Sequence, residues 1–221
     1  MAIILKDIAY SYTGNDTPAV CDISVSFDRG EISAITGPNG CGKTTLAKLI
    51  TGILRPNSGE VIIDDEPILN LNLAEIGRRI GFVMQHPERQ LFCTSVKDEI
   101  EFGLKNIGLR EDEINERREL YLDYFGLKGY EGKFPFELST GEKQRLVIAS
   151  IIAMKPKYLI LDEPTSSLDK LRRAELGALF TMLLEKDDIG IILISHDDKF
   201  VGKYSTRKIK MNNGQIITTV S

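Results

Sequence analysis

Apolar and polar residues alternate over short runs in the first part of the chain. Three such runs follow one another, at residues 3–5, 23–27 and 31–35. Turn-forming residues separate them at 14–16 and 28–30. A period of two between turns predicts an antiparallel β region. After it we expect a helix from Lys43 to about Gly52, and then two further strands, at residues 61–64 and 80–84.

The period becomes helical in the middle of the chain. Apolar residues recur three or four positions apart in three segments, at residues 96–104, 114–125 and 140–154. Strand-like runs resume at 158–161 and 190–194, with a helical pattern at 171–186 between them and short strands near Ile209 and Ile216. This alternation predicts an α/β fold in which helices cover a parallel sheet.

Composition narrows the class of protein. The 221 residues are 42% hydrophobic and 27% charged, which is typical of a globular chain. No apolar run approaches the roughly 20 residues of a membrane span, and the first residues lack the pattern of a secretory signal. Three widely spaced cysteines favour reduced thiols in a cytosol. A formal charge of -4 without a polybasic segment predicts no nucleic-acid partner.

The first candidate for chemistry is a glycine-rich loop between a predicted strand and a predicted helix. It reads GPNGCGKTT and matches the phosphate-binding pattern G-x-x-x-x-G-K-[ST]. Its backbone N–H groups and the helix N-terminus would surround phosphates, while the lysine would reach the β and γ phosphates and the threonine hydroxyl would bind Mg²⁺. A glycine turn that caps an ordinary helix is the alternative. The predicted nucleotide-binding residues are Gly37, Pro38, Asn39, Gly40, Cys41, Gly42, Lys43, Thr44 and Thr45.

Two carboxylates end the apolar strand at residues 158–161. Asp162 at the end of a strand beside the phosphate loop would hold Mg²⁺, and Glu163 would orient and activate a water for attack on the γ-phosphate. The alternative is an ordinary charged strand end. Together with the loop, the pair predicts a nucleoside triphosphatase.

Leu138-Ser139-Thr140-Gly141-Glu142, at the start of a predicted helix, resembles the signature loop of ATP-binding cassette (ABC) ATPases, and the resemblance covers nearly the whole chain. It implies an α/β fold with a P-loop NTPase core, an antiparallel β subdomain and an inserted helical subdomain. One domain would fill residues 1–221, with a core at about 1–84 and 156–221 and a helical subdomain at about 85–155.

The resemblance also assigns roles to residues outside the two motifs. His196 is similar to the switch histidine and, with Glu163, would be catalytic; Gln85 would reach Mg²⁺ or the attacking water. Tyr12 would stack on adenine, although Tyr10 is close enough to compete. Residues 166–169 are similar to the loop that crosses between subunits.

The signature loop implies that one chain is half of a composite site. Ser139 and Gly141 of one cassette would complete the ATP site of a second copy or of a related cassette. Ser139 and Glu142 also form an S-x-x-E capping box, and the two roles coexist. Thr140 replaces a glycine of the family pattern and Glu142 adds negative charge, so we expect a competent but slower site.

Residues 85–92 and 96–103 resemble the ATPases of energy-coupling factor importers, which take up vitamins, nickel or cobalt, with His86 where asparagine is usual. This implies a peripheral subunit on the cytoplasmic face of the membrane, docked to transmembrane subunits near Gln85 and the helical subdomain. Many such ATPases have a C-terminal extension beyond the position of Ser221. Another ABC transporter class, a soluble ABC ATPase and a nucleotide-gated scaffold remain the alternatives.

Overall fold

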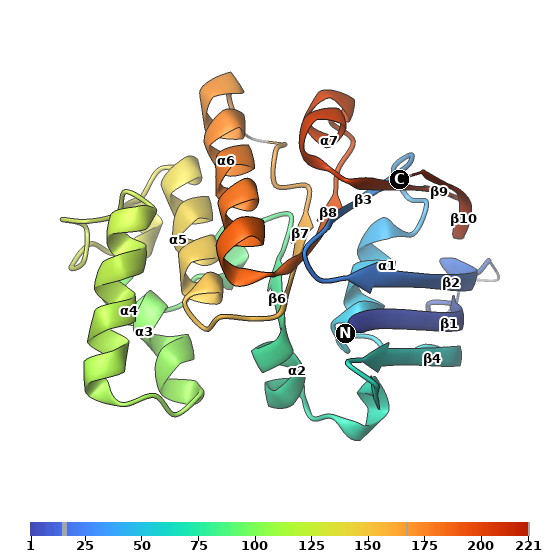
Figure 1. The fold of residues 1–221 in the computed structure, drawn as a ribbon, viewed down its shortest axis with the longest axis horizontal. Coiled ribbons are helices and arrows are strands. Elements are labelled where there is room, and N and C mark those ends of the chain that lie inside the picture. Colours follow the sequence, from blue (N-terminus) through green and yellow to red (C-terminus); the bar gives the residue numbers. More distant parts are fainter. Residues whose placement is uncertain (15–16, 167, 221) are drawn as a thin grey trace.

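The computed structural model describes residues 1–14, 17–166 and 168–220. Asn15 and Asp16 of the predicted turn and Ser167 of the 166–169 segment lie outside the described residues. Figure 1 shows two sheets, with the antiparallel one at the right and helices gathered at the left and top. The fold is therefore mixed α/β, as predicted.

The larger sheet has six strands and carries the functional edge. Their spatial order is β10 (Gln215–Val220), β9 (Arg207–Asn212), β3 (Ile32–Thr36), β8 (Gly190–Ile194), β7 (Tyr158–Asp162) and β6 (Ile80–Val83). Neighbouring strands are parallel except for the β9–β10 hairpin. The loops after β3, β6, β7 and β8 therefore leave the same edge of the sheet.

One prediction about this sheet is wrong. Residues 31–35 were assigned to the antiparallel region, but β3 pairs in parallel with β8 and β9. The polar residue of this run, Ser33, is buried, and its hydroxyl donates a 2.6 Å hydrogen bond to Glu31 Oε1. A strand buried on both faces is typical of a parallel sheet, and one satisfied serine does not change that environment.

The smaller sheet is antiparallel. It consists of β2 (Val20–Asp28), β1 (Ala2–Tyr10), β4 (Ser58–Ile63) and β5 (Glu66–Pro67), in that spatial order. Alternate residues of β1, among them Ile3 and Leu5, are fully buried against the larger sheet. The predicted β subdomain is thus confirmed for its first two runs.

Seven α-helices occur in the described residues. They are α1 (Lys43–Ile50), α2 (Leu73–Arg79), α3 (Val96–Asn106), α4 (Glu111–Tyr124), α5 (Thr140–Ile152), α6 (Lys170–Asp187) and α7 (Asp198–Tyr204). Short 3-10 turns form at Ile68–Asn70, Pro87–Gln90 and Pro135–Glu137. Sequence periodicity did not predict α2 and α7, because seven residues are too few for a clear helical period. The boundary of a helical subdomain at 85–155 stays a prediction.

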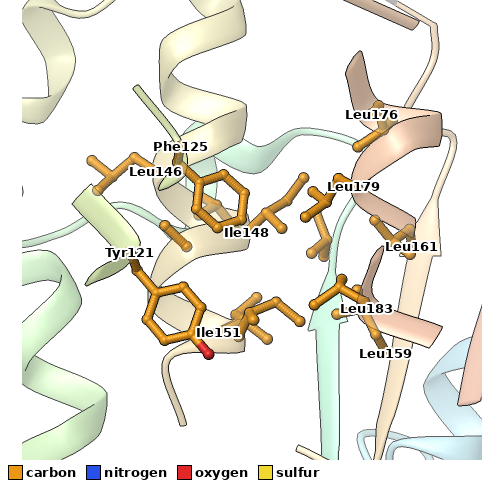
Figure 2. Close-up of a cluster of buried hydrophobic side chains, with 14 of the residues drawn as sticks. Tyr121, Phe125, Leu146, Ile148, Ile151, Leu159, Leu161, Leu176, Leu179 and Leu183 are labelled. Carbon is orange, nitrogen blue, oxygen red and sulfur yellow. The ribbon is translucent and has the colours of Figure 1, made fainter. Parts of the chain in front are cut away.

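Two hydrophobic clusters cover the two faces of the larger sheet. Leu159 and Leu161 of β7 point toward α5 and α6, whereas Tyr158 and Ile160 point toward α1 and the antiparallel sheet. Figure 2 shows the first cluster, in which Ile148 of α5 lies between aromatic residues of the helical block and leucines of α6. The core thus fixes β7, and with it the acidic residues at its end, from both sides. Among the described helices, none combines the length and apolarity needed to cross a bilayer.

Candidate functional site

The predicted site residues gather at the carboxyl edge of the larger sheet, where α/β proteins bind ligands. A cavity of about 650 Å³ opens there, between the loops that follow β3, β6, β7 and β8. The predicted residues that line it are Tyr12, Asn39, Gly40, Gly42, Lys43, Thr44, Thr45, Gln85, Asp162, Glu163 and His196. Thr17, Pro18 and Ala19 line it as well, and no pattern in the sequence indicated them.

Glycines are required where the loop after β3 meets neighbouring backbone. Gly37 has φ 145° and Gly42 has φ 103°. A Cβ at Gly37 would overlap the carbonyl oxygen of Met211, and one at Gly42 would overlap that of Ala19. The Gly214 N–H donates a 3.1 Å hydrogen bond to the Cys41 carbonyl. The turn between β9 and β10 and the segment before β2 thus hold the loop in place.

Lys43 begins α1 and is buried. Its Nζ donates to the carbonyl oxygens of Gly37 at 2.9 Å and Pro38 at 3.0 Å, so the ammonium lies within the curve of the loop. Cys41 is buried as well, with its Sγ 3.9 Å from Lys43 Nζ. Gly37, Pro38 and Cys41 therefore contact the Lys43 side chain, and they are not among the residues that line the cavity.

Thr44 and Asp162 join the loop to β7. The Thr44 hydroxyl donates a 2.7 Å hydrogen bond to Asp162 Oδ2, and Asp162 Oδ1 is buried without a partner among the described residues. Burial raises the pKa of Asp162 above its usual range, and the nearby Glu163 raises it further, while the Thr44 hydrogen bond opposes the shift. An unpartnered buried carboxylate oxygen beside a threonine hydroxyl fits Mg²⁺, which prefers oxygen ligands.

The described residues contain no group of three or more His, Cys, Asp or Glu side chains that would hold a metal by themselves. Mg²⁺ does not need one, because it is commonly held by one or two protein oxygens together with substrate phosphates and waters. The residues present therefore fit a metal that arrives with a nucleotide.

Glu163 directly follows β7 and has a left-handed backbone conformation, which residues other than glycine rarely adopt. Its φ is 51°, and its N–H donates a 2.8 Å hydrogen bond to the Ile194 carbonyl. The side chain is 8% exposed, and its Oε2 lies 2.7 Å from Nδ1 of His196, whose side chain is 64% exposed. Positive φ in a non-glycine residue is costly and tends to occur at functional sites. The sequence predicted both residues but not this backbone geometry.

Tyr12, rather than Tyr10, lines the cavity. Its hydroxyl lies 3.1 Å from Thr45 Oγ1, and its ring meets Tyr10 edge to face at a centroid distance of 5.0 Å. Tyr10 thus supports the ring of Tyr12. Of the two tyrosines, Tyr12 is the one that the structure places at the cavity, and its stacking on adenine stays a prediction.

Ser139 and Gly141, at the start of α5, are not among the residues that line this cavity. Ser139 forms the predicted capping box, in which its N–H donates to Glu142 Oε2 at 2.8 Å and its hydroxyl donates to the same oxygen at 2.6 Å. These hydrogen bonds lower the pKa of Glu142. Gly141 lines a separate cavity of about 320 Å³ between α4, α5 and α6.

Comparison with known proteins agrees with this architecture. The family described as ABC transporter matches residues 20–166. The energy-coupling factor transporter ATP-binding protein EcfA of Methanothermobacter thermautotrophicus is 41% identical, over 97% of this chain and 69% of that protein. EcfA2 of Clostridioides difficile is also 41% identical, over 98% of this chain and 77% of that protein.

Solved structures give the same result. The cbiO1 protein of Clostridium perfringens, part of the ABC transporter complex cbiONQ, superimposes with a TM-score of 0.89 at 36% identity, over 98% of this chain and 87% of that one. The ATP-binding cassette MJ0796, whose structure is a dimer bound to ADP and phosphate, also superimposes with a TM-score of 0.89. The two chains are 25% identical, and the match covers 99% of this chain and 98% of that one. With these matches and the site geometry, the chain belongs to the ABC transporter family, as an ATP hydrolase related to the energy-coupling factor ATP-binding proteins.

Proposed function

We propose that the chain binds ATP in the cavity at the carboxyl edge of the larger sheet and hydrolyses its γ-phosphate. The observation that carries this proposal is the meeting of three features there: the glycine-rich loop, the Thr44–Asp162 pair and the Glu163–His196 pair. Each feature supplies a different need of phosphoryl transfer, namely a phosphate cradle, a metal site and a base.

The residues divide the work of the reaction. Loop N–H groups and Lys43 hold the phosphates, and Tyr12 stacks on the adenine. Glu163 orients a water and takes its proton as the water oxygen bonds to the γ-phosphorus and the bond to the β-phosphate oxygen breaks. His196 holds Glu163 through Nδ1, which leaves Nε2 to face the γ-phosphate. Mg²⁺, when bound by Thr44, Asp162 and Gln85, would neutralise charge on the phosphates.

The working unit is a pair of cassettes, either two copies of this chain or this chain with a related one. Ser139 and Gly141 of one cassette face the phosphates held by the other. Two observations support this arrangement: Ser139 is not part of its own chain's nucleotide cavity, and it begins a helix whose N-terminal N–H groups suit an anion. The dimeric state of the related cassette with ADP and phosphate supports it too.

The pair powers an importer of the energy-coupling factor type from the cytoplasmic face of the membrane, with a vitamin or a transition-metal ion as its solute. The names of the relatives and the cbiONQ complex of cbiO1 support this assignment. Copurification of the native complex tests it. Membrane subunits and a bound solute are expected, whereas a complex with ribosomes or DNA would favour a soluble ABC ATPase, and membrane subunits of another type would favour another transporter class.

The transmembrane partner docks near Gln85 and on α3. Phe92 and Phe102 are exposed there and meet edge to face at a centroid distance of 4.7 Å. Two exposed aromatic rings supply the apolar centre that a stable interface requires. Changing both phenylalanines to serine should abolish copurification with membrane subunits and leave ATP binding unchanged.

ATP binding itself is tested by Lys43→Ala. The variant should lose tight binding of a fluorescent ATP analogue, because the charge that meets the β and γ phosphates is gone. Lys48→Ala is the matched control, since Lys48 lies on the same helix but is not among the residues that line the cavity. A phosphate-release assay on the wild type then separates a hydrolase from a nucleotide-gated scaffold.

A further inference from the structure

Arg173, in the first turn of α6, contacts two segments that approach the site from different strands. Its Nε donates a 3.0 Å hydrogen bond to the Leu168 carbonyl. Its Nη1 forms an ion pair with Asp197 Oδ2 at 2.7 Å. Leu168 follows Glu163 along the chain, and Asp197 is the residue directly after His196.

Both segments are fixed locally. After Glu163, the Ser166 N–H donates to the Glu163 carbonyl and the Leu168 N–H to the Thr165 carbonyl, each at 3.2 Å.

The second segment is fixed through Asp197, whose side chain is only 14% exposed. One of its oxygens, Oδ1, accepts the Phe200 N–H at 3.1 Å and caps α7. Its own N–H donates to Ser195 Oγ at 3.1 Å. The other oxygen, Oδ2, binds Arg173. Both carboxylate oxygens of Asp197 therefore have a partner.

These contacts form a closed ring of contacts that includes the Glu163–His196 pair. The ring of contacts runs from Glu163 along the chain to Leu168, across Arg173 to Asp197, and back through His196 to Glu163. The imidazole of His196 is largely exposed and contacts Glu163 through a single nitrogen. The orientation of the imidazole therefore depends on where the His196 backbone is held.

We infer that Arg173 is a positioning residue that fixes His196 against Glu163 by joining the segments that follow them. The planar guanidinium is suited to this role, because its fork of donors reaches a carbonyl and a carboxylate at the same time, which an ammonium does less well. The inference rests on the proposed hydrolysis of ATP. Arg173 is not among the residues that line the nucleotide cavity in the described part of the chain.

Arg172 provides a matched control. It is the preceding residue on the same helix, and its side chain is 43% exposed against 42% for Arg173. Its guanidinium forms an ion pair with Glu175 at 2.8 Å on α6 itself. A change at Arg172 therefore removes an arginine of similar exposure without touching the ring of contacts.

The test measures steady-state ATP hydrolysis of Arg173→Met and Arg172→Met in the complex purified with its partner chains. Arg173→Met should lower kcat about tenfold, since small misplacements of catalytic groups have effects of that order or larger. KM for ATP should stay within twofold, and Arg172→Met should match the wild type. A merely structural role would instead lower the melting temperature without separating kcat from KM.

Equal kcat values for the two variants would overturn the inference, as would a rise in KM with kcat unchanged. If Arg173→Met does not fold, Arg173→Lys carries the same comparison against Arg172→Lys. Combining Arg173→Met with Asp197→Asn should add little to the loss from either change alone, because both open the same ring; additive losses would contradict it. A wild-type complex without hydrolysis would refute the proposed function instead.

Discussion

Thr44 Oγ1 donates a hydrogen bond of 2.7 Å to Asp162 Oδ2, and 118 residues separate the two along the chain. The contact joins the phosphate loop to the end of β7, and it leaves Asp162 Oδ1 buried and unpartnered within the described residues. A buried carboxylate oxygen without a partner is costly. This arrangement suits a bound cation. Without the cation, the unpartnered Asp162 oxygen destabilises the folded protein.

Asp162→Asn should separate folding from metal binding. In the absence of nucleotide the variant should be as stable as the wild type or up to about 2 kcal/mol more stable, because a neutral amide is easier to bury than a carboxylate. It should lose the additional rise in melting temperature that Mg²⁺ gives with ATP. Thermal melts with ATP in EDTA and with Mg²⁺ and ATP measure both effects.

The pH dependence follows from the raised pKa of Asp162. A carboxyl whose folded pKa is raised contributes stability below its unfolded pKa, near pH 4, and that contribution is lost as pH rises through the folded value. The stability of the Asp162→Asn variant should therefore exceed that of the metal-free wild type increasingly as pH rises above 4. A difference that stays constant with pH would show that this carboxyl does not titrate as described.

Gly37→Ala should distort the phosphate loop, because the new methyl group would overlap the Met211 carbonyl. We expect the affinity for ATP to fall at least tenfold, measured by titration with a fluorescent analogue. Gly108→Ala is the control: its φ is also positive, at 81°, but its Cβ would meet no atom within 4 Å, and Gly108 does not line the nucleotide cavity. The control should lose only about 1 kcal/mol of stability from backbone strain. Similar ATP affinities in the two variants would refute the fixed geometry of the loop.

The signature segment predicts a slow composite site. Glu142 holds both the N–H and the hydroxyl of Ser139, so the serine proton is directed at a carboxylate and not at a phosphate. Replacing Thr140 by glycine and Glu142 by glutamine should raise the single-turnover rate several-fold, because the glutamine carries no charge to repel the phosphate. An unchanged rate would remove this explanation.

Glu101 of α3 is a buried charge that connects α3 to α4. Burial alone would raise its pKa, but hydrogen bonds from Lys105 and Arg118 lower the pKa below its usual value. Its contribution is thus present above about pH 4 and lost as pH falls through the folded value. Glu101→Gln should cost about 2 kcal/mol at pH 7 and less than that at pH 3.

Glu119→Gln is the control for this prediction. Glu119 binds the same Arg118 at 2.9 Å, but its side chain is 54% exposed. Its removal should cost less than about 0.5 kcal/mol at either pH. Urea unfolding at the two pH values measures all four numbers, and equal costs for the two glutamates would contradict the importance of burial.

The sequence predicted most of the residues that line the cavity because each of them lies in a local pattern. The loop at Gly37–Thr45, the acids at the end of β7 and the histidine after β8 each lie in a short segment that indicates its own element and its own function. Parallel strands bring their carboxyl ends to one edge, and therefore predicting the strands also placed these residues together.

What the sequence could not supply depends on contacts between distant segments. Three features join residues that no local pattern connects. They are the parallel pairing of β3, the position of residues 17–19 at the nucleotide cavity, and the contact between Arg173 and Asp197. The positive φ of Glu163 is similar, since it follows from how Ile194 holds the end of β7. These features are set by packing of the whole fold.

The association state of Glu163→Gln with Mg²⁺ and ATP tests the central claim most directly. Sedimentation would be measured for the chain alone and for the complex with its copurified partners, together with the fate of the bound ATP. The account predicts an ATP-dependent pair of cassettes, with intact ATP retained at the junction, because binding is preserved while the base is missing. Solitary cassettes in both preparations at saturating ATP, or near-normal hydrolysis by the variant, would contradict it.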